Sequence, residues 1–365
     1  MKIALQENPF FFNSTERKIV LALFSVLWIF LFVRAIFVPV LHDEIATFFY
    51  YIQSDNYLPP SAHWDANNHV LNSMFANISY HIFGSSPLAL RLPNVLTYAL
   101  FFYGAVQIAG RLNKKIIRWG LLLALVASHY LFEYMGECRG YGMSMAFFVM
   151  AIFQFIRAKE TDKRKYFLYM AIFLFLGTAA NLTLIIPSVI LFATLFLHTL
   201  INHFKTNTRT FFINSVTLLL TGLPFLILVK LSFAFKERGA FYYGGDSGFY
   251  DVTVRSLSQV FTDFYNLPIA IGITTLFISF ILFLSFKLFK TKSLRFILEN
   301  SGLFPFLLVT NVVCILILFH KMEVNFPEDR VAMHLFILFI SVITYYFKTT
   351  NFRLNISSNS AIGTV

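Results

Sequence analysis

The chain contains repeated apolar segments, each long enough or nearly long enough to cross a lipid bilayer. A helix of about 20 apolar residues spans the hydrocarbon core. Ten such segments lie near 19-40, 87-110, 119-134, 141-157, 166-180, 182-201, 211-233, 266-288, 302-319 and 331-347. Of the 365 residues, 58% are hydrophobic and 13% are charged, a balance that a water-soluble core of this size could not hide from solvent. The sequence therefore predicts an all-α polytopic membrane protein with about ten transmembrane helices.

The charged residues between these segments indicate the orientation of the chain. With the N-terminus in the cytoplasm, 20 of the 29 lysines and arginines lie on the cytoplasmic side, and 13 of the 18 acids lie outside or at the outer ends of spans. Cytoplasmic loops are enriched in Lys and Arg, so we expect both termini inside. This topology and anionic lipids account for the net charge of +11, and no nucleic-acid partner is expected.

The predicted orientation places the larger connecting segments outside the cytoplasm. These segments are 41-86, 234-265 and 320-330. We interpret residues 1-347 as one transmembrane domain and 348-365 as a short cytoplasmic tail. In the first outer segment, apolar residues from Val70 to Ile82 recur at helical spacing, which predicts an amphipathic helix at the membrane surface. Any chemistry is expected to be extracytoplasmic.

Two adjacent carboxylates, Asp43 and Glu44, follow the first apolar segment in LHDEI. At the outer mouth of a helix bundle, such a pair is either a solvated helix end or part of a site. The residues that follow favour a site. They are the polar stretch HWDANNH at 63-69 and the stretch FGSSPLALRLPNVL at 83-96, where the second span begins.

This arrangement resembles the GT-C superfamily of integral-membrane glycosyltransferases, whose relatives include the protein O-mannosyltransferases and the lipid A aminoarabinose transferases. The resemblance is densest over 41-95 and extends more loosely through ECRGY at 137-141 and FPEDR at 326-330. It departs from the family pattern at 66-69, where ANNH replaces a His-Pro-Pro. The substrate class is therefore left open.

The resemblance implies transfer of a sugar from a polyprenyl-phosphate donor to a lipid, glycan or protein acceptor, at the outer face of a bacterial inner membrane. Asp43 matches the catalytic carboxylate, which accepts or orients the acceptor proton. Glu44 is the second catalytic candidate, acting directly or positioning the loop or the sugar. Arg139 and Arg330 either hold the leaving phosphate bidentately or are interfacial arginines that reach lipid headgroups.

Asp65, His69 and Tyr141 complete the predicted substrate-binding set. Asp65 and His69 share one face if the helix begins near Asp65. With Asp43 they are candidates for binding a divalent cation, although no cofactor is required, since some relatives need no metal. The alternative is a capping aspartate with surface histidines. Arg91 is expected to be structural and to tie the second span to the outer loop.

Two other functions are weighed against this interpretation. A transporter or flippase of lipid-linked glycans would be expected to carry charges within its spans and internal repeats. Lys230 is the main charge of that kind, and the two halves show no convincing similarity. A polysaccharide polymerase or ligase would be expected to have a large outer loop in its C-terminal half, and 234-265 is small for that role. The acidic first outer loop favours the glycosyltransferase.

Overall fold

The computed structural model of the chain describes residues 10–240, 243–262 and 264–349. These residues form helices, and within these ranges there is no strand, only an isolated β-bridge between Gly245 and Phe326. The predicted all-α class is confirmed. Most of the predicted tail, from residue 350 onward, lies outside the described residues.

The long helices follow the apolar segments of the sequence. In chain order they are α1 (Ser14–Phe37), α4 (Pro87–Ala109), α5 (Lys115–Val126), α7 (Gly140–Thr161), α8 (Arg164–Ala180), α9 (Ile185–His203), α10 (Thr208–Gly222), α11 (Phe225–Glu237), α13 (Leu267–Thr291), α15 (Asn300–Met322) and α16 (Met333–Thr349). The shorter elements are α2 (His42–Thr47), η1 (Phe48–Ile52), α3 (Val70–Phe83), α6 (His129–Tyr134), η2 (Leu182–Leu184), η3 (Tyr250–Val254), α12 (Arg255–Thr262), α14 (Arg295–Leu298) and η4 (Asp329–Ala332).

Seven helical stretches among the described residues are long and apolar enough to cross a membrane. They are Ser14–Phe37, Pro87–Ala109, Gly140–Thr161, Leu182–His203, Thr208–Glu237, Leu267–Thr291 and Gly302–Met322. The other three predicted spans coincide with shorter helices. The segment 119-134 is interrupted between α5 and α6, while α8 and α16 have 17 residues each, about 26 Å of helix. These helices support the polytopic membrane class. Seven of the ten predicted spans are long and apolar enough, among the described residues, to cross a membrane.

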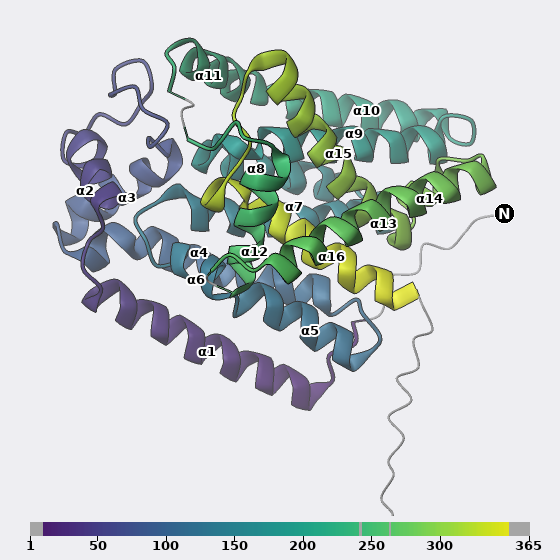
Figure 1. Ribbon diagram of the computed structural model, residues 1–365, viewed down its shortest axis with the longest axis horizontal. Helices are drawn as coiled ribbons and strands as arrows, with labels where there is room; N and C mark the ends of the chain where they lie inside the picture. Colours follow the sequence, from purple (N-terminus) through teal and green to yellow (C-terminus); the bar gives the residue numbers. More distant parts are fainter. Residues whose placement is uncertain (1–9, 241–242, 263, 350–365) are drawn as a thin grey trace, which may run out of the picture.

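α7 lies in the interior of the bundle, where it packs against α4 and α8. In the most apolar 18-residue stretch of α7, 94% of the residues are buried. Gly104 of α4 approaches α7 so closely that a Cβ there would come within 2.9 Å of Val149. Small residues permit such close approach between membrane helices. By contrast, only 17% of the residues in the equivalent stretches of α1 and α13 are buried, and α1 runs along one edge of the molecule (Figure 1). Such exposed apolar helices are suited to contact with lipid.

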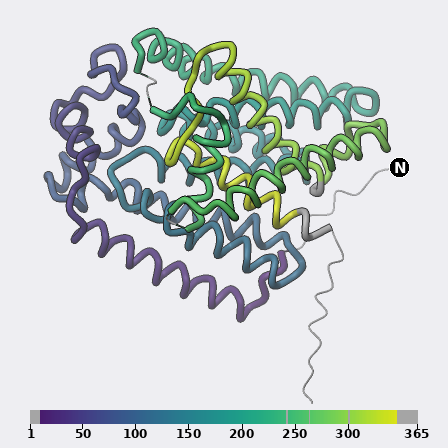
Figure 2. The backbone as a smooth tube through the Cα atoms, in the orientation of Figure 1, coloured from purple at the N-terminus to yellow at the C-terminus, as the bar shows by residue number. Residues whose placement is uncertain are grey.

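The first outer segment, with α2, η1 and α3, gathers at one end of the long helices (left in Figure 1). Figure 2 shows the chain leaving α1, passing through this segment and returning into α4. The helix predicted from Val70 is confirmed as α3. Its polar side faces the protein, because Asn77 donates to the carbonyl of Ile52 at 2.8 Å and Asn72 is fully buried. Leu71 packs into a buried cluster, whereas Ile82 remains 66% exposed, so only the C-terminal part of the apolar side is available to lipid.

Candidate active site

The loop that carries the two adjacent carboxylates is fastened by Glu44. The main-chain N–H of Leu41 donates to Glu44 Oε2 at 2.9 Å and closes the first turn of α2. Arg91 of α4 donates to both carboxylate oxygens, at 2.8 and 2.6 Å. The N–H of Cys138 adds a hydrogen bond to Oε1 at 2.6 Å. The exposed fractions of the Glu44 and Arg91 side chains are 0% and 2%, so this pair lies inside the protein.

The enclosure of Glu44 does not support a direct catalytic role. Its two oxygens already accept four hydrogen bonds, and a carboxylate has about four acceptor positions. The geometry favours the alternative role, in which Glu44 positions the loop. The structural role predicted for Arg91 is confirmed, because its guanidinium also donates to the carbonyl oxygens of Val38 and Pro39 at 2.7 and 2.9 Å. Arg91 thereby joins the end of the first span to α2.

Asp43 faces two arginines that come from distant parts of the chain. Arg139, which precedes α7, forms an ion pair with Asp43 Oδ2, and Arg330 of η4 lies 3.3 Å from the same oxygen. Burial raises the pKa of Asp43, but the charge and hydrogen bond of Arg139, and then the charge of Arg330, outweigh it and hold the pKa below its usual value. Asp43 is therefore ionised at neutral pH and is a weak proton acceptor while both arginines face it.

Two tyrosine rings flank the guanidinium groups. The ring of Tyr141 lies 5.3 Å from the guanidinium carbon of Arg139 and 5.7 Å from that of Arg330. Tyr243, from the outer segment 234-265, places its ring 4.6 Å from Arg330 and donates its hydroxyl to Asp329 at 3.2 Å. Contacts between cations and aromatic faces favour the charged side chain in a partly dry site. All three outer segments thus contribute to the surroundings of Asp43.

A pocket of about 340 Å³ opens beside Asp43. Its lining includes His42, Asp43, Tyr134, Glu137, Arg139 and Arg330. Glu137 was not among the predicted site residues, although its place two positions before Arg139, at the start of an apolar span, was a usable signal. Burial, followed by repulsion from Glu44, raises the pKa of Glu137 to about 7. Glu137 can therefore gain or lose a proton near neutral pH in the pocket that Asp43 lines.

Asn94 of α4 positions the turn that carries Glu137 and Arg139. Its amide nitrogen donates to the carbonyl of Arg139 at 2.7 Å and to Asn72 Oδ1 at 2.9 Å. Its Oδ1 accepts a hydrogen bond from the N–H of Met143, also at 2.9 Å. The side chain is completely buried, so it links α3, α4 and the start of α7 without solvent. This amide was not identified from the sequence.

His69 lies behind the pocket rather than in its lining. Its Nδ1 is 2.9 Å from the carbonyl oxygen of Ala180, and its ring meets the ring of Tyr141 edge-on at 4.6 Å. Its Nε2 is buried and has no hydrogen-bond partner among the described residues. Burial and the nearby charge of Arg139 lower the pKa of His69 to about 3, so the ring is neutral. His69 contacts Tyr141, whose ring in turn lies beside the two arginines that face Asp43.

The candidate metal ligands Asp43, Asp65 and His69 do not form a three-ligand group in the described part of the chain. Asp65 instead accepts a hydrogen bond from the N–H of Asn67 at 2.7 Å, in the turn before the helix. Because α3 begins at Val70 and its N-cap is His69, Asp65 and His69 do not share a helical face, and the alternative role of Asp65 as a helix cap is wrong as well. The carboxylate of Asp43 is opposed by two guanidinium groups, which disfavour a cation at the same oxygen. The surroundings of Asp43 therefore suit an anion better than a metal ion.

Comparison with known proteins yields no match to any family description, curated protein or solved structure. The functional interpretation accordingly rests on the pocket beside Asp43 and on the sequence resemblance over 41-95.

Proposed function

We propose that the chain is a membrane glycosyltransferase of the GT-C kind, which moves a sugar from a polyprenyl-phosphate donor to a lipid, glycan or protein acceptor. In this proposal the pocket beside Asp43 opens on the outer face of a bacterial inner membrane. The termini lie in the cytoplasm, and the helices near 119-134, 166-180 and 331-347 complete ten spans. The asymmetric distribution of lysine and arginine between the two sides supports this orientation.

The observation that carries the proposal is the opposition of one carboxylate and two arginines in a pocket at the end of apolar helices. Arg139 and Arg330 lie within ion-pair distance of Asp43 Oδ2. A planar guanidinium can donate two parallel hydrogen bonds to a phosphate. A carboxylate beside a phosphate-binding pair is suited to a reaction in which a hydroxyl is activated and a phosphate leaves.

The proposed reaction is a single displacement. The acceptor hydroxyl oxygen forms a bond to the anomeric carbon, and the bond between that carbon and the phosphate oxygen breaks. The phosphate departs on its lipid with the bonding electron pair and is stabilised by Arg139 and Arg330, while the hydroxyl proton passes to the carboxylate of Asp43. Attack from the face opposite the phosphate gives inversion of the anomeric configuration.

The arginines also explain how Asp43 becomes a better base only when donor is bound. In the free protein their charge keeps its pKa low. When the donor phosphate takes over hydrogen bonds from Arg139 and Arg330, the burial that raises the pKa of Asp43 is less strongly opposed. Binding of the donor therefore increases the basicity of Asp43 at the moment when a proton has to be accepted.

Glu137 is placed to continue the path of that proton. It shares the pocket with Asp43, and its pKa of about 7 allows it to exchange a proton with water at neutral pH. We assign it the role of returning Asp43 to the ionised form after each transfer. A Glu137→Gln variant is then expected to lower kcat with less effect on the KM for the donor.

The test is sugar transfer from radiolabelled polyprenyl-phosphate sugars by membranes containing the wild-type protein, Asp43→Asn or a matched control. The control is Asp55→Asn, because Asp55 lies in the same outer segment but is exposed and contacts His81 and Asn77. We expect transfer by wild type and Asp55→Asn, loss of about 100-fold or more in Asp43→Asn, and no loss with chelator.

Equal transfer by Asp43→Asn and wild type, at equal expression, would remove Asp43 from the reaction. Loss of transfer with chelator in the wild type would show that a metal is needed. Failure of wild type to transfer from any donor, together with movement of a lipid-linked glycan across reconstituted vesicles, would replace the glycosyltransferase by a flippase.

A further inference from the structure

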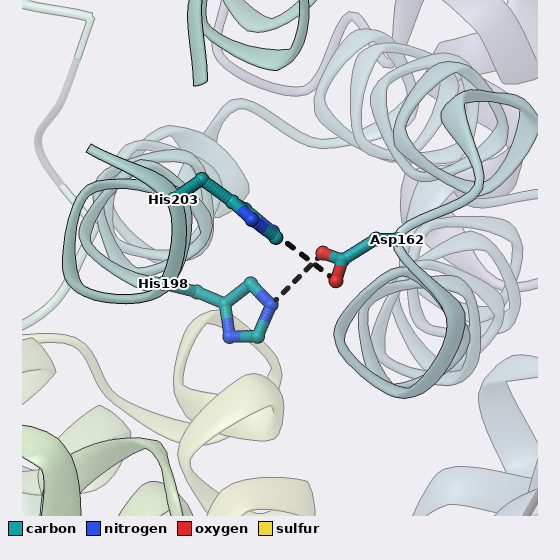
Figure 3. Close-up of side chains that lie close together, drawn as sticks. All are labelled: Asp162, His198 and His203. Carbon is teal, nitrogen blue, oxygen red and sulfur yellow. Dashed lines mark hydrogen bonds and ion pairs between the residues drawn. The ribbon is translucent and has the colours of Figure 1, made fainter. Parts of the chain in front are cut away.

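Three potential metal ligands meet far from the pocket beside Asp43. Asp162, which follows α7, faces His198 and His203 of α9 (Figure 3). Among the described residues this is the one group of three whose ligand atoms all lie within 4.8 Å of one another. Arg139 precedes the first residue of α7 and Asp162 follows the last, so the 22 residues of the helix separate the two places by about 33 Å.

The spacing of the three side chains suits a tetrahedral metal ion. His198 Nε2 lies 3.2 Å from Asp162 Oδ1, and His203 Nε2 lies 3.2 Å from Oδ2. Charge-assisted hydrogen bonds are usually shorter, about 2.7–2.9 Å. Ligands placed about 2.0–2.1 Å from a tetrahedral Zn²⁺ are about 3.3 Å apart, close to the two separations found here. Only a small movement of the three side chains toward a shared ion would be needed for all of them to coordinate it.

His203 is held less well than His198. Its Nε2 lies at ion-pair distance from Asp162 Oδ2, 3.2 Å, but it makes no well-aligned hydrogen bond to any residue that the structure describes. A buried polar atom without a good hydrogen bond is costly. A metal ion between the histidines and the carboxylate would satisfy it, because a neutral imidazole nitrogen offers a lone pair to the metal.

The neighbours of the three side chains are also those of a metal site. Nδ1 of His198 lies 3.0 Å from the side-chain amide of Asn202, and rotation of that amide by half a turn lets Asn202 accept a hydrogen bond from Nδ1–H. Such a bond orients the ring with Nε2 toward a metal.

We propose that Asp162, His198 and His203 bind a divalent transition-metal ion, best matched by Zn²⁺, with water as the fourth ligand. Imidazole and carboxylate ligands suit Zn²⁺, whereas Mg²⁺ favours sites built from oxygen atoms alone. The ion ties the end of α7 to the end of α9. Its distance from Asp43 gives it a structural role that is independent of the proposed sugar transfer.

The experiment uses the full-length protein in detergent, with the affinity tag removed and metals stripped by chelator. Zn²⁺ and Mg²⁺ are titrated separately by calorimetry, and thermal unfolding is followed with and without each ion. We expect one Zn²⁺ per chain and a higher Tm with Zn²⁺, with no response to Mg²⁺. Co²⁺ is expected to show the intense visible absorption of a tetrahedral site.

Three variants test the ligands one by one. Asp162→Asn keeps the size of the side chain and tolerates the left-handed backbone at this position, where φ is 51°. His203→Ala changes the last residue of α9, and His198→Ala removes the more buried ring. Each is expected to weaken Zn²⁺ binding by at least about tenfold.

The matched control is His81→Ala, which removes a histidine from the exposed two-residue pair with Asp55 and is expected to bind Zn²⁺ like the wild type. Absence of stoichiometric Zn²⁺ binding by the wild type would overturn the proposal. Unchanged binding in Asp162→Asn and His203→Ala, with the wild-type far-UV spectrum, would overturn it as well. Because no sugar transfer is measured, the outcome does not depend on the proposed enzymatic function.

Discussion

Replacement of Arg91 by alanine tests how the active-site loop is held. In the folded protein the guanidinium of Arg91 makes hydrogen bonds to both oxygens of Glu44 and to the carbonyl oxygens of Val38 and Pro39. Arg91→Ala leaves the carboxylate of Glu44 buried, with only the N–H groups of Leu41 and Cys138 facing it. The variant therefore exposes the cost of a buried charge without its counterion.

The expected loss is about 3–5 kcal/mol of unfolding free energy, the usual result of removing one partner of a buried ion pair. A matched control is Arg34→Ala, because Arg34 also joins a span to a glutamate, Glu133, at 2.6 Å, but the two side chains are 22% and 34% exposed. Water screens that pair, so about 1 kcal/mol or less is expected. Replacement of both partners, Arg91→Met with Glu44→Leu, should recover much of the loss.

Unfolding free energies are measured by titration of each protein with sodium dodecyl sulfate in mixed micelles, followed by tryptophan fluorescence and circular dichroism. A loss in Arg91→Ala no greater than that in Arg34→Ala would refute the reasoning, since it would mean that Glu44 is hydrated when Arg91 is removed. A double variant less stable than Arg91→Ala would show that packing rather than charge holds the loop.

Three further predictions concern the turn and helices around the pocket. Folding raises the pKa of Glu137 from 4.5 to about 7, so the folded state binds more protons than the unfolded state between these pH values. The free energy of unfolding should therefore fall by up to roughly 3 kcal/mol as pH rises from 4.5 to 7. Unfolding of Glu137→Gln, measured over the same pH range, should not show this fall. Asn94→Ala removes the amide that holds the carbonyl of Arg139. It should lower the free energy of unfolding by about 1–3 kcal/mol and raise the KM for the donor in transfer assays. An unchanged KM would mean that Asn94 does not position Arg139 for donor binding. Gly140→Ala would bring a Cβ against the carbonyl oxygen of Ala180 and within 2.6 Å of His69 Cβ, so its Tm should drop by several degrees, whereas Gly120→Ala, with nothing within 4 Å, should keep or raise it.

The sequence predicted the features that depend on residues near one another in the chain. Long apolar runs predict helices because hydrocarbon offers backbone groups no other hydrogen-bond partner, and the helices lie where those runs lie. The same local logic predicted the helix that begins at Val70 and placed Asp43 at the end of a span. It did not reveal which side of α3 faces the protein, because Asn72 and Asn77 find buried partners in other segments.

Only the tertiary structure decided which charges meet. Arg139 and Arg330 are 191 positions apart in the numbering, yet both face Asp43, and nothing local distinguishes them from arginines that reach lipid headgroups. Residue type alone did not separate the adjacent carboxylates, but packing enclosed the side chain of Glu44 against Arg91 and left that of Asp43 37% exposed in the pocket. The group of Asp162, His198 and His203 was likewise invisible, since it joins the ends of α7 and α9. Apolar pattern and charge asymmetry are encoded along the chain, whereas the pairing of buried charges depends on how helices pack in three dimensions.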